Sequence, residues 1–279
     1  MTKTIQQNKE PEKSVPTAWI FDVDGVLSDP IEKKPTQPQL LIKLADILKQ
    51  NRIIALNTGR SLEWVKNRIL TYLEQNITEK AFLSNLFIVG EKGASWMEYV
   101  NGNWQTGLDI SLSLPASLKK QIKDIVAQNT SKSAFYDEGK KVMATIEMKD
   151  NYSTEKFAKD QALLLPKVQT ALNEFEGEFT LDYSIIDIDI QHKNSGKSLG
   201  ARRILEWLKR KGIKPQTFIT FGDNRSDFEM AEELQKDGYS VQFVFVGKDK
   251  TLAENKNYPV FISKEPFEKG TLEFLNSSN

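Results

Sequence analysis

Short apolar runs alternate with stretches of helical periodicity along the first third of the chain. Residues 18–21, 53–56 and 86–89 are apolar throughout, as expected for strands that are buried on both faces. Between them, residues 40–49 and 62–73 carry apolar side chains at helical spacing, which predicts two amphipathic helices. Because strands and helices alternate, we predict a doubly wound α/β fold with a mostly parallel sheet.

The pattern changes in character after Gly93. The segments that follow contain tight-turn signals and period-two alternation, which are typical of antiparallel hairpins and half-buried strands. The elements predicted here are hairpins centred on 101–102 and 137–139, helices over 118–126 and 154–174, and a strand over 186–190.

Elements of the parallel type return after Gly196, with a helix over 199–211 and buried strands over 218–221 and 241–246. We therefore predict a Rossmann-like α/β core that is interrupted by an inserted α+β domain. The predicted boundaries are a disordered lead-in over 1–16, a core over 17–94 and 191–279, and the insert over 95–190.

Composition excludes several classes of function. Lysine plus arginine and aspartate plus glutamate both number 38, and this balance argues against nucleic acid or an anionic membrane as the main partner. No cysteine is present. The chain has a single histidine, His192, but no Gly-x-Ser-x-Gly motif whose serine it could activate. The chain has no apolar run that would span a bilayer, and its polar first residues do not form a secretory signal, so we expect a cytoplasmic protein.

Two carboxylates follow the first predicted strand. Asp22 and Asp24 are separated by one residue and precede Gly25, which permits a turn close to a ligand. Ligands of open α/β sheets bind at the carboxyl ends of the strands, and paired acids suit a divalent cation with nucleophilic or acid–base chemistry. Taken alone, the pair is equally compatible with a solvated acidic turn or a helix N-cap.

Thr58 and Gly59 follow the second strand, and Lys197 begins the helix after Gly196. A hydroxyl and N–H groups at a helix N-terminus form an anion site, and a lysine at this edge would place positive charge beside a phosphoryl group. Helix capping by Thr58 or Ser61 and an ordinary surface position for Lys197 are the alternatives. The Gly-Lys-Ser triplet at 196–198 is not a P-loop, because the upstream glycine of that motif is absent.

A second acidic pair, Asp223 and Asp227, follows the strand over 218–221. Loop solvation or helix capping would explain this pair on its own. Together, however, the two acidic pairs, Thr58 and Lys197 all follow strands or begin helices at one edge of the predicted sheet. They supply carboxylates for a cation, a hydroxyl and a positive charge, and this combination predicts a site for phosphoryl chemistry.

This set of residues resembles the four motifs of the haloacid dehalogenase-like superfamily. The motifs are matched, in the order of the family, by Asp22, Asp24 and Val26, by Thr58, by Lys197, and by Asp223 and Asp227. The segment 91–94, Glu-Lys-Gly-Ala, is similar to the Glu-Asn-Gly-Ala that leads into the C2-type cap of the Cof-like branch, which includes sucrose- and trehalose-phosphate phosphatases. Two departures are Lys92, where asparagine is usual, and the sequence Ser-Leu-Gly at 198–200, where Gly-x-Ala-Leu is commoner.

The resemblance implies a Mg²⁺-dependent phosphatase that acts on a small phosphomonoester, with phosphorylated sugars as the best class. Asp22 would attack phosphorus and form an aspartyl phosphate, while Asp24 would serve as acid and then as base. The remaining implied roles are phosphate binding by Thr58, Gly59 and Lys197, metal binding by Asp22, the Asp24 main-chain carbonyl and Asp223, and support of the metal shell or of Lys197 by Asp227.

Three alternatives to a phosphatase stay open at this stage. A phosphomutase similar to phosphomannomutase would use the same aspartates but return the phosphate to the sugar. A glycosyltransferase would use Asp22 and Asp24 to bind a metal and a nucleotide sugar, with no role for Lys197 or Asp223. A phosphate-accepting module similar to a receiver domain is disfavoured by the large insert, because a cap covers a site from bulk water. From position alone, we expect the cap to swing near Gly93 and Ser195.

Overall fold

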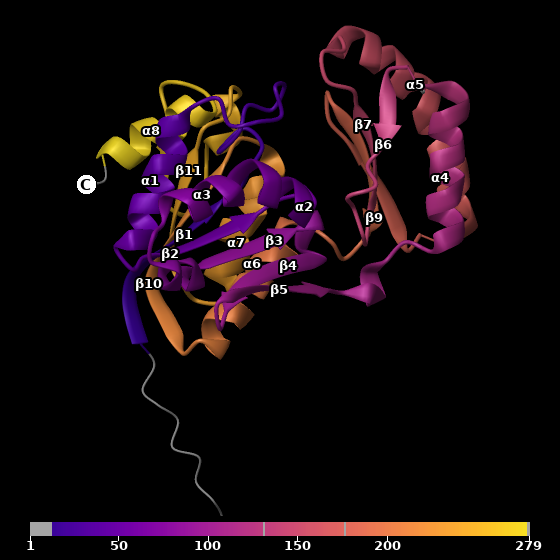
Figure 1. Ribbon diagram of the computed structural model, residues 1–279. Coiled ribbons are helices and arrows are strands. Elements are labelled where there is room, and N and C mark those ends of the chain that lie inside the picture. The colour runs from indigo at the N-terminus through magenta and orange to yellow at the C-terminus, as the bar shows by residue number, and fades with distance from the viewer. Residues whose placement is uncertain (1–12, 131, 176, 278–279) are drawn as a thin grey trace, which may run out of the picture.

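The computed structural model describes residues 13–130, 132–175 and 177–277 (Figure 1). Residues 1–12 of the predicted lead-in lie outside the described part. The expectation of disorder is wrong for residues 13–16, because strand β1 (Lys13–Phe21) already pairs in parallel with β10 from Lys13 onward. Val15 is buried in the core, so the strand already makes apolar contacts before the predicted apolar run at 18–21.

The core is an eight-stranded sheet in the order β12-β11-β10-β1-β2-β3-β4-β5. The strands from β12 to β3 are parallel, and β4 and β5 are antiparallel additions at one edge. This arrangement confirms the predicted α/β fold. The strands that follow β1 are β2 (Ile53–Asn57), β3 (Leu86–Gly90), β4 (Ser95–Val100), β5 (Asn103–Leu108), β10 (Ile213–Gly222), β11 (Ser240–Phe245) and β12 (Val260–Ile262).

Helices cover both faces of this sheet, as a doubly wound fold requires (Figure 1). Side chains alternate along β1, so that Trp19 and Phe21 pack with one group of helices while Ala18 and Ile20 pack with the other. The first group is α1 (Pro38–Lys49), α2 (Leu62–Val65), α3 (Thr71–Asn76) and α8 (Glu268–Ser277), and the second is α6 (Lys197–Arg210) and α7 (Phe228–Lys236).

The predicted hairpin around residues 101–102 forms as β4 and β5, but it belongs to the core sheet. Strand β4 turns back after a short 3-10 helix and pairs antiparallel with β3, placing Met97 in the core. The strand pairing therefore moves the start of the inserted domain from the predicted residue 95 to a point beyond Leu108. Local hairpin signals do not reveal which existing sheet edge a hairpin will extend.

The inserted domain is a four-stranded antiparallel sheet in the order β6-β7-β9-β8, with two helices packed on one face. We call it the cap. Ile146 and Ile188 point into the cap's own core, so their neighbours Glu147 and Asp187 lie on the opposite face. Within the cap, strand β8 is the element that the sequence pattern did not predict; in the core, β12 and α8 were not predicted either. The bounds are α4 (Ala116–Asn129), β6 (Ala134–Tyr136), β7 (Ala144–Met148), α5 (Thr154–Leu172), β8 (Phe179–Tyr183) and β9 (Asp187–His192).

Among the helices of the described residues, none combines the length and the apolar character that a membrane span needs.

Candidate active site

The first acidic pair lies where β1 ends, at the carboxyl edge of the core sheet. Asp22 is buried, and its N–H donates to the Phe221 carbonyl of the neighbouring strand β10. Asp24 lies in the turn that follows and keeps part of its side chain exposed. Gly25 has a φ of 76°, and a Cβ at this position would come within 2.3 Å of the Asp223 carboxylate. A glycine is therefore needed for the second acidic pair to approach the first.

Thr58 and Gly59 occupy the turn after β2, beside the Asp22 turn. Thr58 is fully buried, its N–H donates to the Val89 carbonyl, and its hydroxyl oxygen accepts the Arg60 N–H at 3.1 Å. Ser61, not Thr58, is the N-cap of α2, since its hydroxyl oxygen accepts the Trp64 N–H. The capping alternative for Thr58 thus has no support in the geometry.

Lys197 is a buried lysine, in contrast to the surface position that is common for this residue type. Its Nζ lies 2.5 Å from Asp22 Oδ1 and 2.8 Å from Asp227 Oδ1, and it donates to the Asn57 carbonyl at 2.8 Å. Gly200 permits this close packing of α6 on β2, because a Cβ there would meet the Asn57 side chain at 1.9 Å. Burial lowers the pKa of Lys197, but the two aspartates outweigh it, so the net pKa is raised and the side chain stays charged.

The second acidic pair follows β10, and its two aspartates make different contacts. Asp227 is fully buried, and its Oδ2 accepts the N–H groups of Asp223 and Asn224 while its Oδ1 pairs with Lys197. Asp227 therefore shapes its own loop and orients the lysine. Asp223 extends from that loop towards Gly25 and the first acidic pair.

Carboxylate oxygens of Asp22, Asp223 and Asp227 lie within 4.8 Å of one another. Burial raises the pKa of Asp22 to about 7; Lys197 opposes this shift, while Asp227 and Asp24 add to it. The pKa of Asp223 is also raised, by burial and then by the charges of Asp227 and Asp22. Crowded buried acids of this kind are stabilised by a divalent cation, and oxygen donors suit Mg²⁺, so the residues fit that ion.

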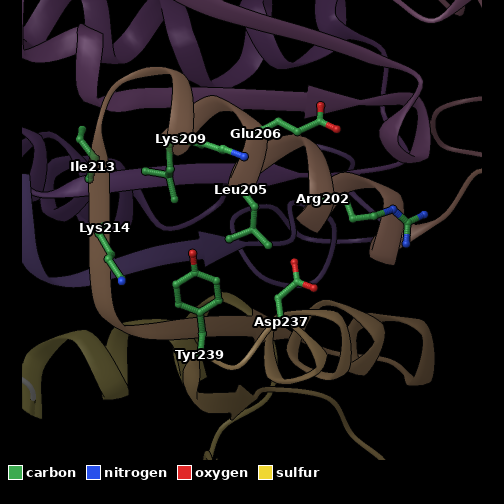
Figure 2. A pocket seen from close by; sticks show the side chains of 9 residues that line it. Arg202, Leu205, Glu206, Lys209, Ile213, Lys214, Asp237 and Tyr239 are labelled. Carbon is green, nitrogen blue, oxygen red and sulfur yellow. The ribbon is translucent and has the colours of Figure 1, made fainter. Parts of the chain in front are cut away.

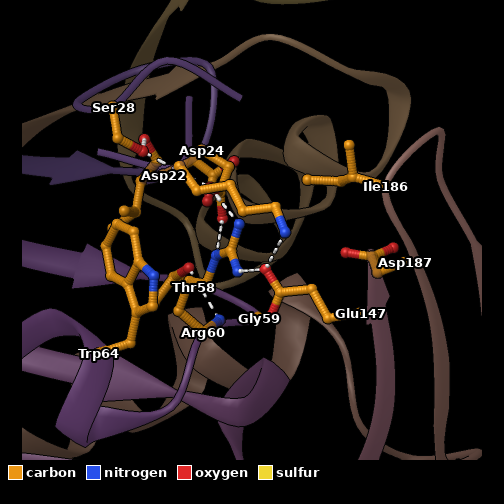
Figure 3. A network of polar contacts seen from close by, with 12 residues as sticks. Asp22, Asp24, Ser28, Thr58, Gly59, Arg60, Trp64, Glu147, Ile186 and Asp187 are labelled. Atoms are coloured by element: carbon orange, nitrogen blue, oxygen red, sulfur yellow. Dashed lines mark hydrogen bonds and ion pairs between the residues drawn. The ribbon is translucent and has the colours of Figure 1, made fainter. Parts of the chain in front are cut away.

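Asp24 does not contribute its carboxylate to this cluster. Both of its oxygens accept hydrogen bonds from Arg60, from Nε at 2.8 Å and from Nη2 at 3.0 Å (Figure 3). The predicted set of seven residues therefore converges on one edge of the sheet, and the Asp24 carboxylate is bound by Arg60 and is not part of the acidic cluster. The predicted main-chain role of Asp24 toward a metal is compatible with this orientation.

Arg60 and Glu147 are site residues that sequence reasoning missed. Arg60 directly follows Thr58 and Gly59 in the chain, but the motif match assigned no role to it. Glu147 lies in the predicted strand of a hairpin in the insert. Arg60 Nη1 donates to Glu147 Oε1 at 2.6 Å, which joins the core to the cap (Figure 3). A charged residue within a mostly apolar strand is the signal that would have drawn attention to Glu147.

The cap turn around residues 137–141 also reaches the site. Lys140 Nζ donates to the Gly59 carbonyl at 2.5 Å and lies 3.9 Å from Asp189 on β9. Lys92, in the short 3-10 helix between core strands β3 and β4, pairs with Asp189 at 3.0 Å. Asp189 also accepts the Thr145 hydroxyl, and its pKa is lowered to about 2 because these cations outweigh burial.

A separate hollow of about 480 Å³ lies on another part of the core (Figure 2). It is lined by residues of α6, including Arg202 and Lys209, and by Ile213 and Tyr239 near the amino ends of β10 and β11. That is the opposite edge of the sheet from the acidic pairs, so this hollow is not part of the site described above.

The order of elements and the four converging motifs define a hydrolase class. Residues 19–243 match the family described as haloacid dehalogenase-like hydrolase, and the chain belongs to that family. The match confirms the resemblance drawn from the motifs and the prediction of a hydrolytic enzyme. No curated protein matches the sequence.

Solved structures share the fold over nearly the whole chain. The C-terminal domain of trehalose-6-phosphate phosphatase from C. albicans has a TM-score of 0.65 at 18% identity, covering 94% of this chain and 92% of that one. A haloacid dehalogenase-like hydrolase from Bacteroides thetaiotaomicron has a TM-score of 0.64 at 13% identity, covering 94% and 99%. The sucrose-phosphatase from Synechocystis sp. has a TM-score of 0.52 at 13% identity, covering 96% and 98%. At these identities the similarity establishes the fold.

Proposed function

We propose that this protein is a Mg²⁺-dependent phosphomonoester hydrolase that works through an aspartyl phosphate on Asp22. The contact that carries the proposal is the 2.5 Å ion pair between Lys197 Nζ and Asp22 Oδ1, at the end of β1. An anionic nucleophile must approach an anionic phosphoryl group, and a buried lysine on that nucleophile offsets the repulsion. A solvated acidic turn would have no need of a buried lysine.

The reaction has two displacements at phosphorus. In the first, an Asp22 carboxylate oxygen bonds to phosphorus, the bond to the leaving oxygen breaks, and Asp24 donates a proton to that oxygen. In the second, Asp24 takes a proton from water, the water oxygen bonds to phosphorus, and the bond to Asp22 breaks to release inorganic phosphate. Thr58, Gly59 and Lys197 are assigned to the phosphoryl oxygens.

Mg²⁺ would be held by Asp22, Asp223 and the main-chain carbonyl of Asp24, with Asp227 behind them. When bound, the ion neutralises charge on the phosphoryl group and on the crowded acids. The raised pKa values of Asp22 and Asp223 support this assignment, because they mark a cluster that lacks positive charge when only Lys197 is present.

The proposed substrate is a small phosphorylated metabolite, with a sugar phosphate as the best class. Polar and charged side chains of the cap, including Lys140, Asp187 and Asp189, lie on the side that faces the core and suit a hydroxylated alcohol. Two structures with this fold are named as phosphatases of trehalose 6-phosphate and of sucrose phosphate. These names support the class without selecting a member of it.

The direct test is release of inorganic phosphate from a panel of sugar phosphates, with Mg²⁺ and then with excess chelator. We expect turnover that requires Mg²⁺, that Asp22→Asn reduces to the enzyme-free blank, and that Lys197→Ala lowers by about a hundredfold or more. Asp46→Asn, a matched change on the exposed face of α1, should leave the rate unchanged. Full activity of Lys197→Ala in a correctly folded variant would rule out the phospho-aspartate scheme.

The same assay separates hydrolysis from the mutase alternative. A mutase would convert the sugar phosphate to an isomer without releasing phosphate, and this is visible by chromatography of the reaction mixture. Release of phosphate in proportion to loss of substrate supports the hydrolase. Isomer formation without release would overturn it while leaving the role of Asp22 intact.

A further inference from the structure

One guanidinium group joins the acid–base residue of the core to the cap. Arg60 lies in the turn after β2 and is only 5% exposed. Each of its three guanidinium nitrogens donates a hydrogen bond. Nε and Nη2 hold the two oxygens of Asp24, while Nη1 donates to Glu147 Oε1 on strand β7 of the cap (Figure 3). The indole of Trp64 lies 5.0 Å from the guanidinium carbon and covers one face of the group.

A second cation of the core reaches the same cap carboxylate. Lys33, in the loop between β1 and α1, places its Nζ 3.0 Å from Glu147 Oε1 and also donates to the Met148 carbonyl. Lys33 and Glu147 are both buried. Two buried cations of the core therefore converge on one carboxylate of the cap, and removing Glu147 would leave both without this partner.

Arg60 binds the Asp24 carboxylate in a bidentate manner. Two parallel hydrogen bonds from one planar guanidinium fix both the direction and the plane of the carboxylate, which a single contact would not do. The direction of the guanidinium is fixed in turn by Glu147, which is near it only while the cap lies on the core. The orientation of Asp24 is thus connected, through two contacts, to the position of another domain.

Direct binding of substrate is the alternative role for an arginine in this place. A guanidinium that served as a phosphate ligand would need nitrogens that point at the phosphate. Here Nε, Nη1 and Nη2 are each committed to a carboxylate oxygen. The arrangement therefore favours a supporting role over direct contact with the phosphoryl group.

We propose that Arg60 is the positioning residue of Asp24, and that Glu147 of the cap completes this support only when the cap is seated on the core. The proposal rests on the proposed function, because it assumes that Asp24 protonates the leaving oxygen. Proton donation to the leaving group then depends on cap position through named side chains. Neither residue needs to touch the substrate for this coupling.

The test uses two aryl phosphates that differ in how much the leaving oxygen needs a proton. Phenolate is a stronger base than p-nitrophenolate, so cleavage of phenyl phosphate depends more on Asp24. Single-turnover release of the phenol, with enzyme in excess and Mg²⁺ present, reports the first displacement for both compounds. For Arg60→Lys and for Glu147→Gln, we expect phenyl phosphate cleavage to fall at least about tenfold more than p-nitrophenyl phosphate cleavage.

The controls repeat the same chemical changes elsewhere in the molecule. Arg210→Lys alters an arginine–glutamate pair with Glu98 in the core, and Glu138→Gln alters a lysine pair inside the cap. Neither should change the ratio of the two rates. If Arg60→Lys does not fold, Glu147→Gln carries the test, with circular dichroism and a thermal melt confirming that each variant is native.

Each outcome decides for or against the proposal. Equal slowing of both compounds would overturn it and favour direct contact of Arg60 with the phosphoryl group. Slowing by Arg60→Lys with no effect of Glu147→Gln would remove the cap from the coupling. Failure of the proposed function would look different, because wild-type protein would then release no phenol above the Asp22→Asn blank from either compound.

Discussion

At the scale of single residues, Glu147 connects the chemistry of the core to the cap. It is a carboxylate with two buried cations, and the net effect of Arg60 and Lys33 is to lower its pKa from 4.5 although burial opposes them. A carboxylate whose folded pKa lies below its unfolded value stabilises the fold only when it is ionised. This stabilisation is fully present above about pH 4.5, the unfolded value, and is lost as the pH falls through the lowered folded pKa.

We therefore expect Glu147→Gln to be less stable than wild type at pH 7, and the difference to shrink at pH 3. The reason is that protonation of Glu147 turns the wild-type side chain into a neutral group that resembles glutamine. Urea unfolding of both proteins at the two pH values measures this difference. A gap of equal size at both pH values would show that the charge of Glu147 does not contribute to stability.

At the scale of elements, another buried acid of the core, in the turn between β3 and β4, holds the cap. Glu91 follows β3, and its Oε2 accepts the N–H groups of Lys141, Val142 and Met143, the three residues that lead into β7 of the cap. One carboxylate oxygen thus satisfies three backbone donors that would otherwise be partly buried without a partner. Glu91, the first residue of the segment 91–94, therefore has a structural role that the motif did not indicate.

Glu91→Gln should weaken this junction by about 1–3 kcal/mol, because the amide is uncharged and brings donors of its own toward three N–H groups. Chemical unfolding gives the loss of stability, and amide hydrogen exchange at residues 141–143 should become faster than in wild type. Glu178→Gln, the same change at an exposed position, is the control. Unchanged exchange at 141–143 would contradict the anchoring role.

At the scale of the whole molecule, the cap contacts the site edge of the core through ionic groups. Arg60, Lys33 and Glu147 form one cluster, and Lys140 adds a hydrogen bond to the Gly59 carbonyl. The segment that returns from the cap lies beside the turn between β3 and β4, since the Gly196 N–H donates to the Lys92 carbonyl at 2.7 Å. The chain enters the cap only beyond Leu108, so Gly93 lies between two core strands and not in a connection to the cap. The expected swing near Ser195 stays a prediction.

We expect Glu147→Ala to favour a more open cap and so to increase the radius of gyration measured by small-angle scattering. Removing the carboxylate leaves two buried cations facing the cap, which disfavours the seated arrangement. Glu138→Ala, within the cap, should leave the scattering curve as in wild type. A curve that is identical for Glu147→Ala and wild type would argue against the cluster as the contact that seats the cap.

Local patterns predicted most elements because burial on two faces or on one face leaves a direct trace in the order of side chains. The apolar runs at 18–21 and 53–56 and the stripe on α1 are examples. Strand β8 was not predicted, although Phe179, Leu181 and Tyr183 alternate with polar residues; it is a short edge strand of the cap sheet. The hairpin of β4 and β5 was predicted as a hairpin, but its attachment to β3 is a non-local choice.

The sequence by itself determined the fold class and the set of motif residues, because Asp22, Asp24, Thr58, Lys197 and the pair Asp223 and Asp227 all stand where strands end or helices begin. Only the tertiary structure decided that Asp24 faces Arg60 and that Glu147, 87 residues further along the chain than Arg60, completes the contact. The physical reason is that hydrophobic periodicity encodes which face of an element is buried. It does not encode which charges from distant elements will meet once two domains are packed together.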